Sequence, residues 1–277
     1  SPRAGSRSYF GQPRWGGYFR IDFEIGTSLI MFHLVIDIGN SSQKLAVFEQ
    51  RNLVHTELTT SLDTQKLAQL LAQYPCSHSI ISSVKQEVEA LEQYLAKQTT
   101  YIRFSASTPN PIRNQYQSPE TLGLDRLAAM TAVHALFPKQ NTLVVDAGTC
   151  ITYDMLDAQA NYFGGSISPG IQMRFRALHE FTGRLPLVSF SPAPIDLVGI
   201  DTPTALQSGV VNGVIAEVNS IITLYQQKHP QLNVVFCGGD AIFFDSRLKN
   251  SIFASNSSCI PHLVLIGLNE IIHHQHE

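Results

Sequence analysis

The segment FHLVIDIGNSSQK, Phe32–Lys44, decides the fold. Its first seven residues are mostly apolar, which is typical of a buried strand, and Asp37 and Gly39 then end the strand in a turn. The segment TLVVDAGTCITY, Thr142–Tyr153, repeats the pattern later in the chain. A strand that ends in Asp-x-Gly and turns back into a second strand therefore occurs twice, which predicts two related α/β lobes rather than a solenoid.

Each Asp-x-Gly turn carries groups that bind a nucleotide phosphate. Glycine lets a phosphate approach the backbone N–H groups, and the Asn, Ser or Thr that follows adds a hydrogen-bond donor. The carboxylate of Asp37 can hold Mg²⁺ through water, and the metal can bridge to the phosphates. Two such turns on opposite sides of a cleft predict an ATP site, whereas the sequence contains no Walker A pattern, which excludes a P-loop.

A third glycine turn, Gly238-Gly239-Asp240, follows another apolar strand. It suits either a close backbone approach to adenosine or a plain strand-to-helix turn, and the sequence does not separate the two.

Periodicity of apolar residues predicts the remaining elements. The expected strands are Phe32–Ile38, Lys44–Glu49, Leu53–Leu58, His78–Val84, Tyr101–Ser105, Thr142–Val145, Ile151–Leu156, Tyr162–Ser168 and Leu232–Cys237. The expected helices are Leu62–Gln73, Gln86–Lys97, Leu124–Phe137, Ile171–Phe181, Thr204–Gln227 and Pro261–His274. Pro-rich loops, Thr108–Glu120 and Leu185–Pro194, interrupt them.

The repeat divides the chain into two lobes, residues 31–140 and 141–277, with a boundary near Pro138–Asn141. Residues 1–30 are rich in Gly, Arg, Ser and aromatic residues, and we expect them to be a disordered or non-native extension that ends before Met31.

The composition of the chain argues against several classes of function. The 277 residues carry a net charge of −3, which gives no electrostatic case for nucleic acid or an anionic membrane as partner. No apolar run approaches the roughly 20 residues that span a bilayer. The 4 cysteines have no C-x-x-C or zinc spacing, so we expect free thiols and a cytoplasmic enzyme. His273, His274 and His276 are typical of a solvated helix end rather than a metal site.

Five short motifs, in order, resemble those of type III pantothenate kinases. They are Asp37–Lys44 and Asp146–Thr149 as phosphate motifs, Gly123–Arg126 as the pantothenate motif G-x-D-R, and Gly164–Gly170 and Thr182–Pro186 as two further signatures. The resemblance covers nearly everything from Met31 onward. It implies an actin/hexokinase-type (ribonuclease H-like) fold with an ATP cleft between its lobes.

The resemblance also implies a reaction: ATP phosphorylates the primary hydroxyl of pantothenate to 4′-phosphopantothenate, the first step of coenzyme A synthesis. It implies Mg²⁺, a monovalent cation such as K⁺ or NH₄⁺, and a homodimer with pantothenate near the subunit interface. The residues implied to contact ATP are Asp37, Ile38, Gly39, Asn40, Ser41, Ser42, Gln43, Lys44 and Thr149. Asp146 is implied to hold the monovalent cation, and Lys44 is alternatively an exposed strand lysine.

Asp125 is the candidate general base, because a primary alcohol that attacks phosphorus needs a positioned proton acceptor. The alternative is a helix cap, since Asp125 lies at the start of a predicted helix. Arg126 suits the pantothenate carboxylate, because its planar fork pairs with two oxygens. The family motifs place Gly123, Leu124 and Tyr116 in the pantothenate pocket, with Thr182 contributed by the partner subunit.

Two other functions remain open from the sequence. The chain can be a same-fold kinase for another hydroxyl or carboxylate substrate, such as a sugar or acetate kinase. It can instead be a non-catalytic regulatory factor or a filament protein of this fold. The retention of Asp37, Asp125 and Asp146 favours activity.

Overall fold

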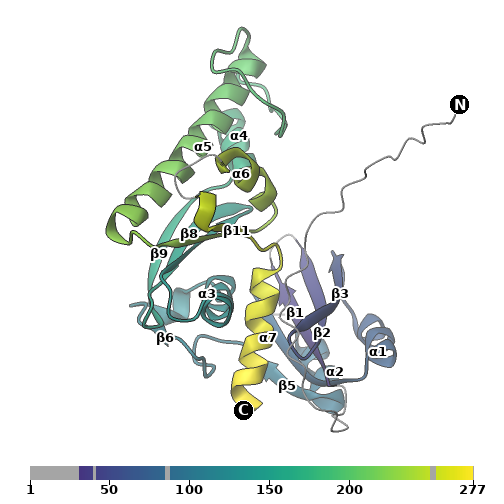
Figure 1. The fold of residues 1–277 in the computed structure, drawn as a ribbon. Helices are drawn as coiled ribbons and strands as arrows, with labels where there is room; N and C mark the ends of the chain where they lie inside the picture. Colours follow the sequence, from purple (N-terminus) through teal and green to yellow (C-terminus); the bar gives the residue numbers. More distant parts are fainter. Residues whose placement is uncertain (1–30, 40–41, 85–87, 250–253, 277) are drawn as a thin grey trace, which may run out of the picture. The chain divides into compact units, whose positions relative to one another are not determined.

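Two mixed β-sheets organise the chain (Figure 1). The computed structural model describes residues 31–39, 42–84, 88–249 and 254–276. The extension predicted for residues 1–30, and Asn40 and Ser41 of the first phosphate motif, lie outside the described residues.

The first sheet has the order β3-β2-β1-β4-β5. Its strands are β1 (Phe32–Ile38), β2 (Gln43–Glu49), β3 (Asn52–Thr59), β4 (Cys76–Ser83) and β5 (Thr100–Arg103). Strands β1 to β3 run antiparallel, whereas β4 and β5 run parallel to β1. Helices α1 (Thr64–Gln73) and α2 (Glu89–Gln98) pack on one face of this sheet.

The second sheet repeats this topology, with the order β11-β10-β7-β8-β9-β6. Its strands are β7 (Thr142–Ala147), β8 (Cys150–Leu156), β9 (Asn161–Pro169), β10 (Asn233–Cys237), β11 (Ser257–Cys259) and, at the edge, β6 (Arg113–Asn114). Strands β7 to β9 are antiparallel, and β10 and β11 are parallel to β7. Helices α4 (Ile171–Glu180), α5 (Thr202–Lys228) and α6 (Ala241–Leu248) cover one face. The predicted internal repeat is confirmed by this matching strand order.

Strand period decides which residues of β1 and β7 face the middle of the molecule. Successive side chains of a strand point to opposite faces, and Leu34, Ile36 and Ile38 pack with α1 and α2. Val35 packs in a different core, and Val144 of β7 belongs to that same core. Asp37 and Asp146 each lie two residues further along their strands, so both carboxylates emerge on this inner face.

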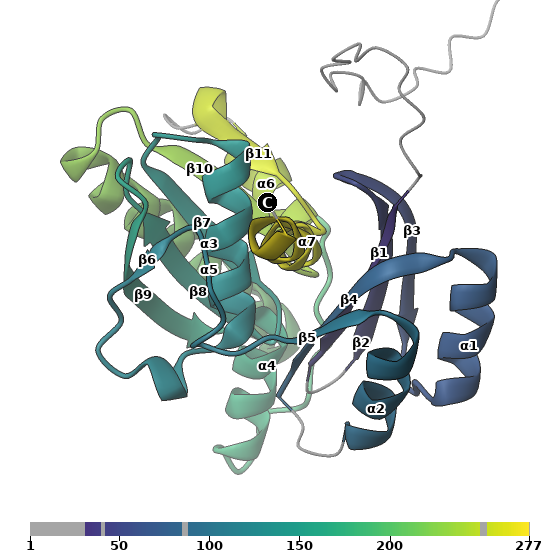
Figure 2. The same ribbon diagram turned by 90° about the horizontal axis from the view of Figure 1, so that it is seen from below.

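Helices α3 (Leu124–Leu136) and α7 (Leu263–His276) lie side by side between the sheets (Figure 2). Their apolar residues form one core with Val35, Val144 and Val235 from both sheets. The two backbones cross closely at Gly267, where a Cβ atom would lie 1.8 Å from the carbonyl oxygen of Ala128. A glycine at this position is therefore what lets α7 pack against α3.

The C-terminal helix is anchored on the first sheet by polar contacts. The buried His33 ring bonds through Nδ1 to Asn269 Oδ1 at 2.9 Å, and Asn269 Nδ2 donates to the Gln50 carbonyl at 2.8 Å. His273 packs its ring 4.8 Å from that of His33, and His276 packs 4.1 Å from His78. His274 and His276 are exposed, as predicted for a solvated helix end, whereas His273 is partly buried against His33.

Most predicted elements occur within a few residues of their expected bounds. Pattern reasoning missed α6, β11 and β6, together with two short 3₁₀ turns, Pro119–Thr121 and Ala254–Asn256. Strand β6 precedes the predicted lobe boundary yet pairs with β9, and α7 follows the boundary yet packs on β1. A division at residue 140 stays a prediction. Among the described residues, no helix combines the length and apolar character needed to cross a bilayer.

We predict that Gly267→Ala lowers the free energy of unfolding by about 1–3 kcal/mol, because the new methyl group forces α3 and α7 apart. Urea unfolding measures this. The matched control is Gly213→Ala in α5, where a Cβ would meet nothing within 4 Å. Alanine should there be neutral or stabilising by up to about 1 kcal/mol. Equal stability of the two variants would contradict the packing argument.

Candidate active site

Asp37 lies at the carboxyl end of β1, which runs between β2 and β4 in the first sheet. Lys44 of β2 and Ser82 of β4 are its register partners. Burial raises the pKa of Asp37 to about 6; Lys44 lowers this pKa, Asp125 and Asp146 raise it, and a hydrogen bond from Ser82 lowers it. The predicted phosphate residue thus lies in a partly buried pocket of charges that includes two more carboxylates.

Asp146 occupies the corresponding place at the end of β7. Burial raises its pKa to about 6; Asp125 adds to the rise, whereas Lys44 and a hydrogen bond from the Cys237 thiol lower it. Asp37, Asp125 and Asp146 therefore lie close enough to influence one another, with Lys44 among them. The two Asp-x-Gly turns thus lie near each other, and their role as an ATP site stays a prediction.

The third glycine turn packs directly against the second. Gly238 has φ +87°, and a Cβ there would lie 2.4 Å from both Asp146 Oδ1 and the Ala147 carbonyl oxygen. The Asp240 N–H donates to the same carbonyl at 2.9 Å. The close approach of Asp146 and Ala147 thus explains why residue 238 is a glycine. A Cβ at Gly239 would meet nothing within 4 Å. Contact of this turn with adenosine stays a prediction.

The first phosphate motif divides between two faces of its sheet. Ile38 packs with α1 and α2, and Gln43 lies on that face with Leu45 and Val47. Gly39 and Ser42 close the turn through a 3.0 Å backbone hydrogen bond. Among the described members, strand period places the side chains of Asp37 and Lys44 on the inner face, whereas Ile38 and Gln43 can contact ATP chiefly through the backbone. Thr149 is exposed in the second turn.

Asp125 lies in the first turn of α3 and is exposed. Its Oδ1 accepts a 2.8 Å hydrogen bond from the Arg126 N–H. The N-cap residue of α3 is Gly123, so the alternative of Asp125 as the cap is wrong. A Cβ on Gly123 would lie 2.5 Å from Asp125 Oδ1, and the glycine thus leaves room for this carboxylate. The helix dipole favours a negative charge here.

Arg126 points away from Asp125 into the second lobe. Its Nε and Nη2 donate to Asp154 Oδ2 and Oδ1 at 2.9 and 2.6 Å, and both side chains are buried. Tyr116 lies beside it, with its ring centroid 5.7 Å from the guanidinium carbon. The carboxylate that pairs with the Arg126 guanidinium is therefore Asp154. The predicted contact between Arg126 and pantothenate would have to use the other N–H groups of the guanidinium.

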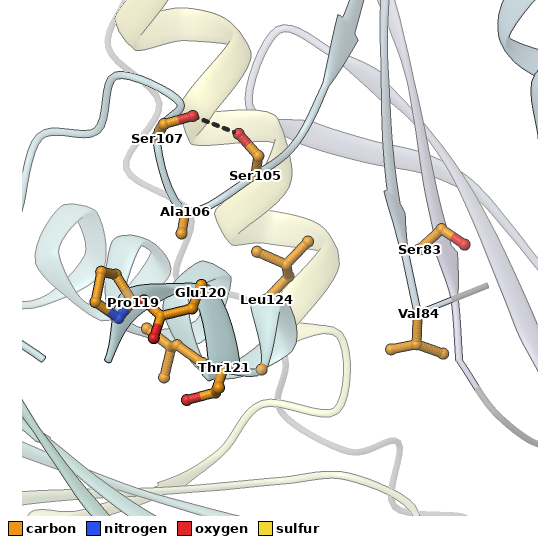
Figure 3. Close-up of a pocket in the computed structure, with 11 residues that line it drawn as sticks. Ser83, Val84, Ser105, Ala106, Ser107, Pro119, Glu120, Thr121 and Leu124 are labelled. Carbon is orange, nitrogen blue, oxygen red and sulfur yellow. Dashed lines mark hydrogen bonds between the residues drawn. The ribbon is translucent and has the colours of Figure 1, made fainter. Parts of the chain in front are cut away.

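A cavity of about 730 Å³ opens beside the start of α3 (Figure 3). Leu124 and Val84 are among the apolar residues that line it, and the Ser105 and Ser107 hydroxyls in its lining lie 3.0 Å apart. The full lining is Ser83, Val84, Ser105, Ala106, Ser107, Pro119, Glu120, Thr121, Leu122, Gly123 and Leu124. Gly123 and Leu124 of the pantothenate motif thus line a cavity directly adjacent to Asp125.

Thr182 lies apart from this group, just after α4. Its hydroxyl donates to the Leu178 carbonyl at 2.6 Å, and the residue is exposed. Its predicted role, which requires a partner subunit, stays a prediction.

Sequence comparison now identifies the family. A sequence model described as "Type III pantothenate kinase" matches residues 33–224. The chain is 42% identical over 241 residues to a type III pantothenate kinase of Phocaeicola vulgatus, covering 87% of this chain and 97% of that one. It is 41% identical over 243 residues to another from Bacteroides fragilis, with coverages of 87% and 98%.

The chain belongs to the type III pantothenate kinase family. The predicted family and the prediction of a kinase are both confirmed.

Two solved structures share the fold of this family member. A proposed Baf-family transcriptional activator from Campylobacter jejuni superposes with a TM-score of 0.56 at 22% identity, covering 87% of this chain and 98% of that one. A proposed N-acetylmannosamine kinase from Listeria monocytogenes gives 0.53 at 12% identity, with coverages of 89% and 100%. These likenesses concern the fold alone and confirm the two-lobe α/β kinase architecture.

Sequence reasoning missed the cavity residues of the first lobe and the partner of Arg126. Ser83 ends β4 and Val84 follows it, while Ser105 comes shortly after β5; both strands run parallel to β1. Ligands commonly bind at the carboxyl ends of parallel strands, so this rule could have pointed to them. No comparable signal marks Asp154, which is one polar residue in an otherwise ordinary strand pattern.

We predict that Asp37→Asn stabilises the ligand-free protein above pH 6. The raised pKa of Asp37 means that the folded form binds more protons than the unfolded form between about pH 4 and 6, so this carboxylate destabilises the fold increasingly as pH rises through that range. Asparagine removes the charge, and the expected gain at pH 7.5 is about 1–2 kcal/mol, shrinking toward pH 4.

Urea unfolding at pH 7.5 and 4.5 tests this, with the exposed Asp196→Asn as control. An Asp37→Asn protein no more stable than wild type at pH 7.5 would refute it.

Proposed function

We propose that this chain transfers the γ-phosphoryl group of ATP to the primary hydroxyl of pantothenate, which forms 4′-phosphopantothenate and ADP in the first step of coenzyme A synthesis. The observation that carries the proposal is the convergence of Asp37, Asp125 and Asp146 at the ends of two equivalent strands and one helix. Family membership supports the substrate.

Asp125 acts as the general base. Its Oδ1 is held by the Arg126 N–H, which leaves Oδ2 for the substrate. As the hydroxyl oxygen of pantothenate bonds to the γ-phosphorus, its proton passes to Asp125 Oδ2 and the bond from phosphorus to the ADP oxygen breaks. The exposed position of Asp125 in the first turn of α3 is compatible with access by both substrates.

Pantothenate occupies the cavity beside Gly123 and Leu124. Leu124 and Val84 offer apolar surface for its carbon skeleton, and the Ser105 and Ser107 hydroxyls offer hydrogen bonds for its polar groups. Arg126 contributes positive charge near the substrate carboxylate, although Asp154 already takes two of its donors. Tyr116 lines the far side of Arg126.

The charges of the site fit cation binding. Lys44 lies near Asp37 and Asp146, and burial and neighbouring carboxylates still raise the pKa of both aspartates to about 6, which a bound cation would counteract. The described residues contain no cluster of three or more His, Cys, Asp or Glu side chains placed to hold a metal. Asp37 would hold Mg²⁺ through water, and Asp146 would hold K⁺ or NH₄⁺. Bound there, the cations would offset phosphate charge.

The active form is a homodimer in the cytoplasm. Several large apolar side chains of the second lobe are exposed, a pattern typical of interaction surfaces; they are Phe163, Ile167, Phe181, Leu197, Val198 and Ile200. Thr182 adjoins Phe181, so pairing through this surface can bring Thr182 to the partner's pantothenate.

We predict that Asp125→Asn folds normally and loses about 10²–10⁴-fold in turnover, because asparagine keeps the shape but accepts no proton. A coupled ADP-release assay with pantothenate measures the rate, and circular dichroism checks the fold. The control is Glu89→Gln, an exposed acid in the first turn of α2. Near-full activity of Asp125→Asn would contradict the proposed base.

We predict that turnover falls about tenfold or more when K⁺ is replaced by a bulky organic cation at fixed ionic strength, because repulsion between Asp146 and phosphate is then less offset. Asp146→Ala should use ATP poorly and respond little to K⁺, whereas the exposed Asp196→Ala should behave as wild type. An unchanged wild-type rate would refute the dependence on a monovalent cation. A strong K⁺ response in Asp146→Ala would show that the cation binds at another residue.

A further inference from the structure

The buried ion pair between Arg126 and Asp154 connects two parts of the proposed site. Arg126 follows Asp125 in the first turn of α3, and Asp154 lies on β8, which begins directly after the second phosphate turn. Both contacts of the guanidinium fork are short, 2.9 and 2.6 Å, and the side chains are 7% and 2% exposed. Charged side chains this deeply buried hold a fixed geometry, because breaking the pair would strand a charge.

Further groups fix Asp154 itself. The buried Tyr162 donates its hydroxyl to Asp154 Oδ1 at 2.8 Å. The Tyr116 ring stacks at 8° to that of Tyr162, with centroids 6.4 Å apart. A Cβ on Gly165 would lie 2.7 Å from Asp154 Oδ1 and 1.8 Å from the Tyr153 carbonyl oxygen, so only glycine leaves this carboxylate in place.

The same arginine also touches the base through its backbone. The Arg126 N–H donates to Asp125 Oδ1 at 2.8 Å, while its side chain ends on Asp154. Strand β8 pairs with β7 so that Thr152 lies opposite Asp146 and Asp154 opposite Val144. A rigid path therefore runs from the strand pair that carries Asp146, through Asp154 and Arg126, to the carboxylate of Asp125.

We infer that Asp154 is a positioning residue for phosphoryl transfer: by holding both donors of the Arg126 fork, it fixes the first turn of α3 and so aims the Asp125 carboxylate at the phosphate turns. The inference rests on the proposed role of Asp125 as base. Misplacement of a reacting group by about 1 Å can reduce a rate about 10²-fold, so this link matters for turnover more than for binding.

The test compares Asp154→Asn with Glu217→Gln. The control weakens another Arg–carboxylate pair of the second lobe, in which Arg174 Nη2 donates to Glu217 Oε2 at 2.7 Å; the other hydrogen bonds to Glu217 come from Tyr153 and Ser168, on β8 and β9. We expect Asp154→Asn to lower kcat about 10²-fold, with KM for pantothenate and Kd for ATP changing less than about threefold. The control should keep wild-type kcat.

A double mutant separates positioning from a general loss of structure. If Asp154 acts through Asp125, then Asp125→Asn combined with Asp154→Asn should be no slower than Asp125→Asn alone. Multiplied effects, a kcat equal to that of Glu217→Gln, or a lowered KM with unchanged kcat would overturn the inference. In the last case Asp154 would only compete with substrate for Arg126.

Hydrogen exchange in α3 tests the positioning role of Asp154 without any measurement of catalysis, so its result is independent of the proposed function. The Leu127 N–H bonds to the Gly123 carbonyl at 3.3 Å in the first turn of α3. Asp154→Asn should speed hydrogen exchange at Leu127 more than Glu217→Gln does, and unchanged exchange would overturn the inference. A wild-type protein that exchanges as expected but does not phosphorylate pantothenate would refute the function alone.

If Asp154→Asn does not fold, a milder substitution at Tyr162 tests the same inference. Tyr162→Phe removes one hydrogen bond to Asp154 and leaves the ion pair, so it should fold and lose kcat about fivefold, again without further loss in the Asp125→Asn background. An unchanged kcat for Tyr162→Phe would then overturn the inference.

Discussion

The close packing of α3 against α7 is the constraint on which the site depends. Both helices lie between the sheets, and their common core includes Val35 from one sheet and Val144 from the other. Because Gly267 allows the backbones to approach, α3 bridges the two sheets without a gap. That packing helps to set where Asp125, in the first turn of α3, lies relative to the two Asp-x-Gly turns.

The site formed in this way is electrostatically unfavourable without ligands. Two partly buried carboxylates have raised pKa values, and Lys44 is a nearby cation that only partly compensates. A fold selected for stability alone would replace these groups. The same imbalance suits a site for a nucleotide that arrives with cations, since the cations lower the repulsion only when ligand is bound.

The residues that surround Asp37 in the first sheet differ from those that surround Asp146 in the second sheet. Lys44 lowers the pKa of both aspartates, but Asp37 also has Ser82 of β4 as a polar partner, whereas Asp146 has the Cys237 thiol and the backbone of a third turn. The repeated strand order therefore accounts for the shared geometry, and the residues of the neighbouring strands account for the different local environments.

The sequence by itself determined the duplicated fold, the two aspartates and the candidate base. Strand period is a local property, so the pattern of Phe32–Lys44 and Thr142–Tyr153 fixed which residues end on the inner face. It did not reveal that Asp154 takes the Arg126 fork, that His273 and His276 pack on the first sheet, or that Ser83 and Ser105 line a cavity. Those facts join segments distant in the chain, and only the packing of helices between sheets decides such contacts, because side-chain pairing across elements has no periodic signature along the sequence.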